Sequence, residues 1–280
     1  MIKSILLPVD GSAYTESVLR HGMELGRALG ALLRVLTVVD VRTYEWVAAF
    51  GSDGFVPVMP SPSYREETER VLNEKADQTL ERTRELIEKE GAGVRFSLEK
   101  VADSPVDAIM ARENTVDMVI MGQRGEYARW ESRLLGATVE SVSRQLEKPL
   151  LVVHQHHRPL KSMLVAYDGS KASNRALQLA AELAVALNAS LELLTVQRDK
   201  EWADRVLTEA IQYLEAYELK PGIRWATGDP EDAILSALEE GGFDVTVLGG
   251  HGHSRLREAI LGSTTVHVMR RAPVPVCLVR

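Results

Sequence analysis

Two patterns of hydrophobic and polar residues alternate along this chain. Short apolar runs, such as 2–8 and 245–248, are typical of strands buried in a parallel sheet. Between such runs, apolar residues recur every three or four positions, as at Leu179, Leu183 and Leu187, which predicts amphipathic helices. Alternating strands and helices favour right-handed crossovers and a parallel sheet covered by helices on both faces, so we predict the α/β class.

The whole pattern occurs twice. An Asp-Gly-Ser triplet, beginning at Asp10 and again at Asp168, follows the first apolar run of each half. Helices and further strands come in the same order in each half, and the expected strands are 2–8, 32–38, 94–98, 118–121 and 150–153, then 163–166, 190–196, 223–226, 245–248 and 276–279. We therefore predict two domains, residues 1–157 and 158–280, which would bind ligands at the carboxyl ends of their strands.

A glycine-rich segment follows the strand expected at 245–248. Two residues separate Gly249 from Gly252, and nine more lead to Gly262 and Ser263, which open an apolar helix. Glycines permit a sharp turn and bring backbone N–H groups close to a ligand, while a helix N-terminus adds partial positive charge. This arrangement favours a bound phosphate, and the flanking strand and helix make the glycine spacing specific.

The spacing Gly-x-x-Gly-x9-Gly-Ser, together with the two Asp-Gly-Ser triplets, resembles the universal stress protein family over nearly all 280 residues. The resemblance implies two tandem Rossmann-like (adenine nucleotide alpha hydrolase-like) domains, each a five-stranded parallel sheet of order 3-2-1-4-5. In the ATP-binding branch, the nucleotide lies across the ends of strands one, two and four. Carried over to the second half, the candidate ATP-binding residues are Ala166, Tyr167, Asp168, Val196, Leu248, Gly249, Gly252, Gly262, Ser263, Thr264 and Thr265.

The first half departs from the family pattern. Its corresponding residues are Pro8, Val9, Asp10, Val38, Met121, Gly122, Gly125, Gly136, Ala137, Thr138 and Val139. Ten residues separate Gly125 from Gly136, with the extra one within 126–135, and Ala137 replaces the usual hydroxyl residue. Because losing one hydrogen bond costs ~1 kcal/mol, we expect the first domain to bind ATP more weakly. Arg124 could compensate by pairing with a phosphate, or it could be a solvated loop charge.

A magnesium or manganese ion is expected beside the triphosphate, because hard cations choose oxygen ligands. Asp10 and Asp168 could hold that ion or the ribose hydroxyls, although a strand-end aspartate is also an ordinary turn or helix-capping residue. No Walker lysine follows either glycine segment, so we expect ATP to be a regulatory or structural ligand. A slow ATPase or adenylyl-transferring enzyme, and a nucleotide-free dimerising scaffold, remain the alternatives.

The histidines and the cysteine suggest little chemistry. Near His251 and His253 the sequence offers no nucleophile–base set, so a loop-shaping role is favoured, and His267 is expected at the surface or an interface. His154, His156 and His157 lie in the junction 154–160, where neighbouring linker positions rarely converge on one metal ion. The lone Cys277 is expected to be a small buried hydrophobe.

Composition excludes several classes of partner. The net charge is −7 and there is no basic block, which argues against nucleic acid. The chain has no apolar run long enough to cross a membrane and no signal peptide pattern, so we expect a cytoplasmic protein. The regulatory protein that such a module would serve cannot be named from these residues.

The last strand of each half, 150–153 and 276–279, is short, β-rich and preceded by proline. Each would lie at the edge of its own sheet with unpaired N–H and C=O groups. The family resemblance implies that such edges pair, so we expect an internal pseudo-dimer that buries Val152, Val153, Cys277 and Leu278. A further homodimer through other surfaces stays open.

The segment 41–63 occurs only in the first half and contains Gly51, Gly54 and three prolines. We expect an irregular loop. Its aromatic residues could line the nucleotide crevice or cover an interface, or the segment could be a surface excursion held by its own apolar residues; they are Tyr44, Trp46, Phe50 and Phe55.

Overall fold

The computed structural model describes residues 1–42, 47–51, 54–58, 61–125, 135–250 and 262–280. The elements of the first half are β1 Ser4–Pro8, α1 Thr15–Leu29, β2 Leu32–Asp40, β3 Val47–Gly51, β4 Gly54–Val58, α3 Pro62–Glu90, β5 Arg95–Asp103, α4 Pro105–Met110, η1 Glu113–Thr115, β6 Met118–Gly122, α5 Ala137–Gln145 and β7 Leu150–Val153. Those of the second half are β8 Ser162–Ala166, α6 Lys171–Leu187, β9 Ser190–Val196, α7 Lys200–Glu215, β10 Gly222–Ala226, α8 Pro230–Gly241, β11 Val245–Gly249, α9 Ser263–Arg271 and β12 Val276–Val279.

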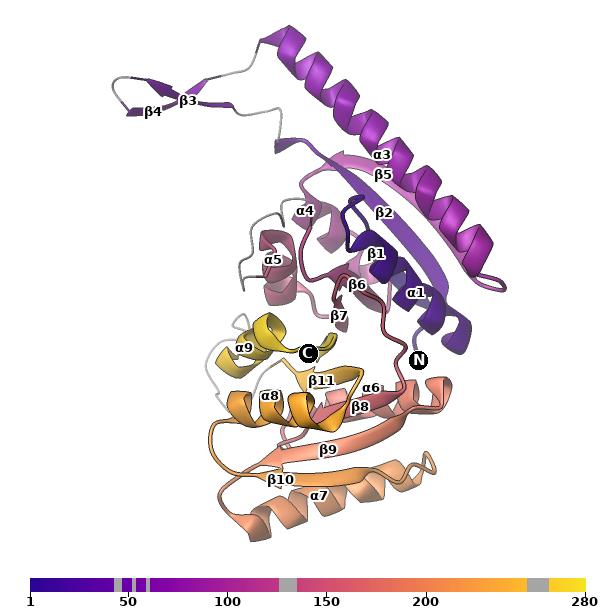
Figure 1. Ribbon diagram of the computed structural model, residues 1–280, viewed down its shortest axis with the longest axis vertical. Coiled ribbons are helices and arrows are strands. Elements are labelled where there is room, and N and C mark those ends of the chain that lie inside the picture. The colour runs from indigo at the N-terminus through magenta and orange to yellow at the C-terminus, as the bar shows by residue number, and fades with distance from the viewer. Residues whose placement is uncertain (43–46, 52–53, 59–60, 126–134, 251–261) are drawn as a thin grey trace.

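One ten-stranded sheet runs through the molecule in the order β10-β9-β8-β11-β12-β7-β6-β1-β2-β5 (Figure 1). Within each half the neighbouring strands are parallel, and the order is 3-2-1-4-5. The expected α/β fold of two Rossmann-like halves is therefore confirmed.

Helices cover both faces of this sheet. Successive side chains of a strand point to opposite faces, and the apolar residues on each face pack into a separate core. In β1, Ile5 and Leu7 face one core and Leu6 faces the other. The first core is closed by α1, α3, α6 and α7, and the second by α4, α5, α8 and α9. Since both faces of the strands are buried, they appear in the sequence as continuous apolar runs.

The two halves join where β7 and β12 pair antiparallel, with Leu151 opposite Cys277 and Val152 opposite Val276. All residues of both strands are buried. The expected internal pairing of the two final strands is confirmed. It satisfies backbone groups that would otherwise lie on the exposed edge of each half-sheet.

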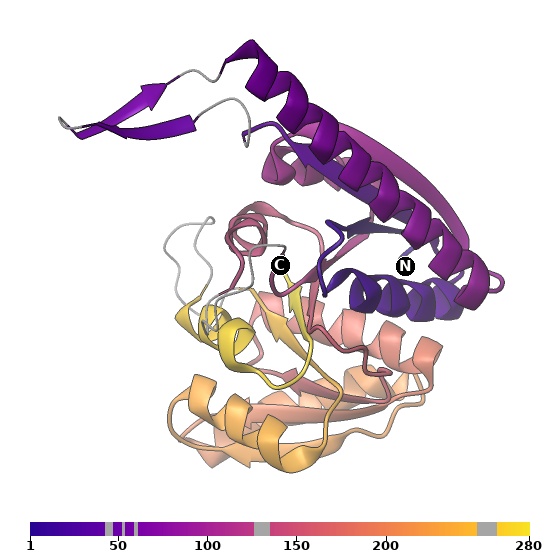
Figure 2. The ribbon, with the colours of Figure 1, turned by 45° about the horizontal axis from the view of Figure 1, so that its top comes forward.

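The segment 41–63 is not wholly irregular, and that expectation was wrong for 47–51 and 54–58. These residues form an antiparallel hairpin of β3 and β4, in which Phe50 is opposite Phe55. The connection between the strands is two residues long, a length typical of hairpins. Figures 1 and 2 show the hairpin projecting away from the ten-stranded sheet. Tyr44 and Trp46 lie outside the described residues.

Strand β5 is longer than the expected 94–98 and continues to Asp103. It lies at the outer edge of the sheet, paired only with β2 among the described strands. Charged residues such as Glu99 and Lys100 are therefore tolerated in the strand, and they interrupt the apolar run that would have revealed it.

Candidate functional site

The two Asp-Gly-Ser triplets form the same tight turn at the ends of β1 and β8. Asp10 Oδ1 accepts a hydrogen bond from the Ser12 N–H at 3.0 Å, and Asp168 makes the same contact at 3.0 Å with the N–H of Ser170. The central glycines have φ of 75° and 72°, which suits glycine. Both aspartates thus have the turn role, and their contact with a ribose or a metal ion stays a prediction.

Glycines end the fourth strand of each half because the start of the first helix packs directly against them. A Cβ at Gly122 would lie 2.6 Å from Tyr14 Cβ, and one at Gly249 would lie 2.7 Å from the carbonyl carbon of Ala172. A Cβ at Gly125 would lie 2.7 Å from Asp10 Oδ2. In the first half the glycine segment therefore lies against the Asp-Gly-Ser turn, at the carboxyl ends of β1 and β6.

The helix after each glycine segment begins at a glycine. Gly136 donates its N–H to the Gln123 carbonyl at 3.0 Å, and Gly262 donates to the Gly250 carbonyl at 3.4 Å. Neither α5 nor α9 has a side-chain cap. The first N–H groups of such helices have no partner within the helix and carry partial positive charge, so an anion is favoured there.

These pieces enclose a cavity of about 530 Å³ in the first half. Its volume lies within the range of about 300–1,000 Å³ usual for small-molecule sites. Every first-half candidate lines it: Pro8, Val9, Asp10, Val38, Met121, Gly122, Arg124, Gly125, Gly136, Ala137, Thr138 and Val139. The structure thus brings together the ends of β1, β2 and β6 and the N-terminus of α5.

Comparison with known proteins agrees with this architecture. The model of the universal stress protein family matches residues 1–154 and again 159–280. The chain belongs to the universal stress protein family. Universal stress protein Slr1230 of Synechocystis is 29% identical over 288 residues that cover 100% of both chains. The crystal structure of a universal stress protein from Archaeoglobus fulgidus superposes with a TM-score of 0.77 at 26% identity and covers 99% of this chain and 98% of that one.

Another solved universal stress protein was crystallised in complex with cAMP. It is 30% identical to this chain and covers 44% of it, and the match includes 98% of that protein, with a TM-score of 0.39. The tandem organisation that the sequence suggested is confirmed by the two matched segments of the family model.

Helix α3 supplies one wall of the cavity that sequence reasoning missed. Leu72, Lys75, Ala76 and Thr79 line it, and Thr79 Oγ1 would lie 2.6 Å from a Cβ at Gly11. The family motifs lie at strand ends, in loops and at helix starts, and none of them lies on α3. The signal available in the sequence was the helical spacing of Ala76, Thr79 and Thr83, which the structure shows to be buried on one face of α3.

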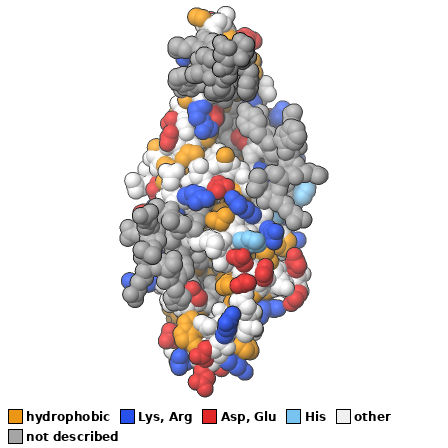
Figure 3. Space-filling view, turned by 90° about the vertical axis from the view of Figure 1, so that its left-hand side faces the viewer, with side chains coloured by type: hydrophobic (Ala, Val, Ile, Leu, Met, Phe, Trp, Pro, Cys, Tyr) orange, Lys and Arg blue, Asp and Glu red, His pale blue; other side chains and the backbone are white. Residues whose placement is uncertain are grey.

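Both signs of charge line the cavity. Arg42 binds Asp40 through two hydrogen bonds of 2.8 and 2.7 Å, and this contact raises the pKa of Arg42. Lys75 of α3 and Arg124 of the glycine segment add positive charge to the lining. Figure 3 shows a face of the molecule on which basic and acidic side chains are interspersed.

In the second half, several candidates use their polar groups within the protein. The Tyr167 hydroxyl donates to Asn174 Oδ1 at 2.9 Å, and burial raises the pKa of this tyrosine. Thr265 is buried, and its hydroxyl donates to the Gly249 carbonyl at 3.4 Å; its contact with a phosphate stays a prediction. Ala166 and Val196 end β8 and β9, and Leu248 lies in β11.

Only some of the residues expected to bind phosphate in the second half are among those that the structure describes. Ser263 and Thr264 lie in the first turn of α9. Gly252, His251 and His253 lie outside the described residues. The expected ranking, with tighter ATP binding in the second domain, therefore stays a prediction.

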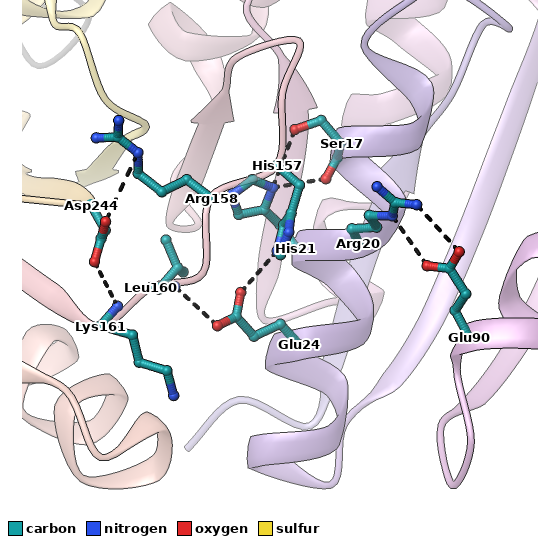
Figure 4. A network of polar contacts seen from close by, with 10 residues as sticks. All are labelled: Ser17, Arg20, His21, Glu24, Glu90, His157, Arg158, Leu160, Lys161 and Asp244. Carbon is teal, nitrogen blue, oxygen red and sulfur yellow. Dashed lines mark hydrogen bonds and ion pairs between the residues drawn. The ribbon is translucent and has the colours of Figure 1, made fainter.

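One of the linker histidines, His157, contacts helix α1 at the junction between the domains (Figure 4). His157 Nε2 lies 3.2 Å from Glu24 Oε2, and its ring meets His21 edge-on with 4.5 Å between centroids. Glu24 also accepts the Leu160 N–H at 3.0 Å. In the described part of the chain, no group of three or more His, Cys, Asp or Glu side chains could hold a metal ion.

The structure also shows how far Cys277 and His267 are buried. Cys277 is buried in β12 as expected, and burial raises its thiol pKa to about 12. His267 is half-buried on α9. No helix within the described ranges has the length and apolar character to cross a membrane.

Proposed function

We propose that each domain binds ATP in the crevice at the carboxyl ends of its strands and that the nucleotide acts as a regulatory or structural ligand. The observation that carries this proposal is the cavity of the first half, which gathers family-motif residues from β1, β2, β6 and α5. Such convergence of separate segments on one crevice is expected at a nucleotide site of an open α/β sheet.

The uncapped start of α5 suits the phosphates. Gly136, Ala137 and Thr138 line the cavity, and their N–H groups belong to the first turn, where an anion is best stabilised. Lys75 and Arg124 lie on the same lining and would add Coulombic attraction. The absence of a hydroxyl at Ala137 removes one donor, which supports weaker binding in this domain than in the second.

The apolar part of the cavity suits the nucleoside. Val38 lies near the end of β2, where its backbone would read the adenine, and Met121 would flank the ribose and phosphates. Asp10 lies beside Gly125 on the cavity lining, and its carboxylate would bind the ribose hydroxyls.

A divalent cation fits this site only as a companion of the triphosphate. Because no described cluster of three ligating side chains exists, a magnesium or manganese ion would take most of its ligands from phosphate oxygens and water. Asp10 in the first domain and Asp168 in the second are the carboxylates that would hold or orient it. The ion would neutralise adjacent phosphate charges.

The test uses the full chain and introduces a carboxylate at the glycine that begins α5 or α9, where a phosphate is expected. Gly136→Asp and Gly262→Asp should each weaken ATP binding at their own site tenfold or more. The added carboxylate would repel the phosphates from the helix N–H groups, and hydrogen bonds to charged groups contribute about 1.5–3 kcal/mol. Both glycines have extended backbone conformations that aspartate can adopt. Ser61→Asp is the matched control, because it also adds a carboxylate at a helix N-cap but at the exposed start of α3.

Calorimetry with ATP gives the affinities, and the absorbance of the denatured supernatant shows whether nucleotide copurifies. Unaltered ATP binding in both crevice variants would place the nucleotide elsewhere, and no binding by the wild type would favour the nucleotide-free scaffold. Release of ADP or AMP that the crevice variants abolish would instead favour a slow ATPase or adenylyl-transferring enzyme. A larger loss in Gly262→Asp than in Gly136→Asp is the result expected from the ranking of the domains.

A further inference from the structure

The two helices at the proposed phosphate sites each reach into the other domain. Helix α9 begins at Gly262 in the second half, and near its C-terminal end the Met269 carbonyl accepts a hydrogen bond of 3.1 Å from Gln123 Nε2. Gln123 belongs to the glycine segment of the first half, between Gly122 and Arg124, which line the cavity. Its side chain is thus used for contact with the other domain.

A counterpart exists in the opposite direction. Helix α5 begins at Gly136 in the first half, and the Arg144 carbonyl at its other end accepts a hydrogen bond of 2.6 Å from Arg280 Nη2. Arg280 follows β12, and its Cγ would lie 3.0 Å from a Cβ at Gly250. Gly250 is the second-half counterpart of Gln123. The carbonyl of each accepts a hydrogen bond from the N–H of the glycine that begins the following helix. Arg280 therefore occupies the space that a side chain at Gly250 would take.

The two helices also contact each other. Arg270 of α9 lies 3.3 Å from Glu140 of α5, and Glu140 in turn pairs with Arg144 at 2.9 Å. Rigid helices joined by such contacts can transmit a change at one end to the other.

We propose that nucleotide binding in one domain strengthens nucleotide binding in the other, through α5 and α9. This inference rests on the proposed function. The N–H of Gly136 binds the carbonyl of Gln123, so a phosphate that orders the start of α5 also orders the segment that holds the end of α9. A second nucleotide then loses less conformational entropy when it orders the start of α9. The result is positive cooperativity without a large movement. The effect is reciprocal, as linkage requires.

The experiment uses the full chain with Gly262→Asp, which disables the second site so that added ATP occupies only the first. Hydrogen exchange of residues 263–271 is measured with and without ATP. Exchange should slow about fivefold on addition of ATP, which is near the lower end of usual coupling between sites. Adding Gln123→Ala should abolish this slowing. Gln123→Met, which keeps the length of the side chain and removes the donor, should do the same if the alanine variant is poorly folded.

The matched control is Gln145→Ala. Gln145 also donates its amide to a helix carbonyl, that of Ser141, but within α5 itself. This variant should retain the slowing of 263–271.

Exchange of residues 136–145 in the same samples reports binding at the first site. Protection of 136–145 with no change at 263–271 would overturn the coupling and leave ATP binding intact. Protection of neither segment would show that ATP does not bind the first domain, and the coupling would fall together with the proposed function. Slowing of 263–271 that persists in both Gln123 variants would also overturn the coupling path.

Discussion

Acid should destabilise this protein through one buried histidine, His21 of α1. The side chain of His21 is fully buried. Its Nδ1–H donates to the Ser17 carbonyl at 2.8 Å, and the ring packs against His157 beside Glu24 (Figure 4). Its Nε2 makes no hydrogen bond to the described residues, and a second proton on the ring would place a charge in a fully buried position.

The size of the effect follows from the pKa. Burial lowers the pKa of His21 from 6.5 to about 4, and the nearby His157 acts in the same direction while the Ser17 contact opposes it. At about 1.4 kcal/mol for each pH unit, protonation of the unfolded chain removes about 3 kcal/mol of stability. The histidine is neutral in the folded protein, so this stability is fully present above pH 6.5, falls as the pH drops, and levels off below about 4.

The assay compares the free energy of unfolding of the wild type and His21→Gln by chemical denaturation between pH 7.5 and 4. His21→Gln loses packing at every pH, so the informative quantity is the difference between the two curves as the pH changes. Relative to the variant, the wild type should lose about 3 kcal/mol over this range. Groups that do not contact His21, such as His154, whose pKa burial also lowers, titrate in both proteins and cancel in the difference.

His156→Gln provides the matched control. His156 is exposed in the same linker, so its curve should follow that of the wild type. Parallel curves for the wild type and His21→Gln would refute the reasoning and show that His21 titrates alike in the folded and unfolded chains.

Three further predictions concern the crevice and the seam. Gly125→Ala should weaken ATP binding of the first domain at least tenfold by calorimetry, because its Cβ would lie 2.7 Å from Asp10 Oδ2; unchanged affinity would show that the two segments can separate freely. Val152→Pro should accelerate hydrogen exchange of 276–279, since proline removes a donor from the strand that pairs with β12, and slow exchange there would contradict the pairing. Chelation of divalent cations should lower ATP affinity, and an unaltered constant would remove the ion from the proposed site.

The amino-acid sequence alone was sufficient for the repeat, the strand order that the family resemblance implies, and the family-motif residues that line the first-half cavity. These features depend on local backbone requirements. Strands buried on both faces need continuous apolar runs, and the turn at Gly11 needs a positive φ. Such requirements leave a pattern at short spacing, and the family resemblance that this pattern carries implied one crevice for Asp10 and Gly136 before their contacts were known.

Only the tertiary structure decided which distant side chains meet. Strand β5 was underestimated and the β3–β4 hairpin was missed, because an edge strand with charges and a short glycine-flanked hairpin lack the apolar signature of buried strands. The wall formed by α3 depends on how that helix packs over Gly11. The contact of Gln123 with Met269 joins residues 146 positions apart. No periodicity encodes such a contact, because it results from the antiparallel pairing of β7 with β12, which brings the glycine segment of one domain against the last helix of the other.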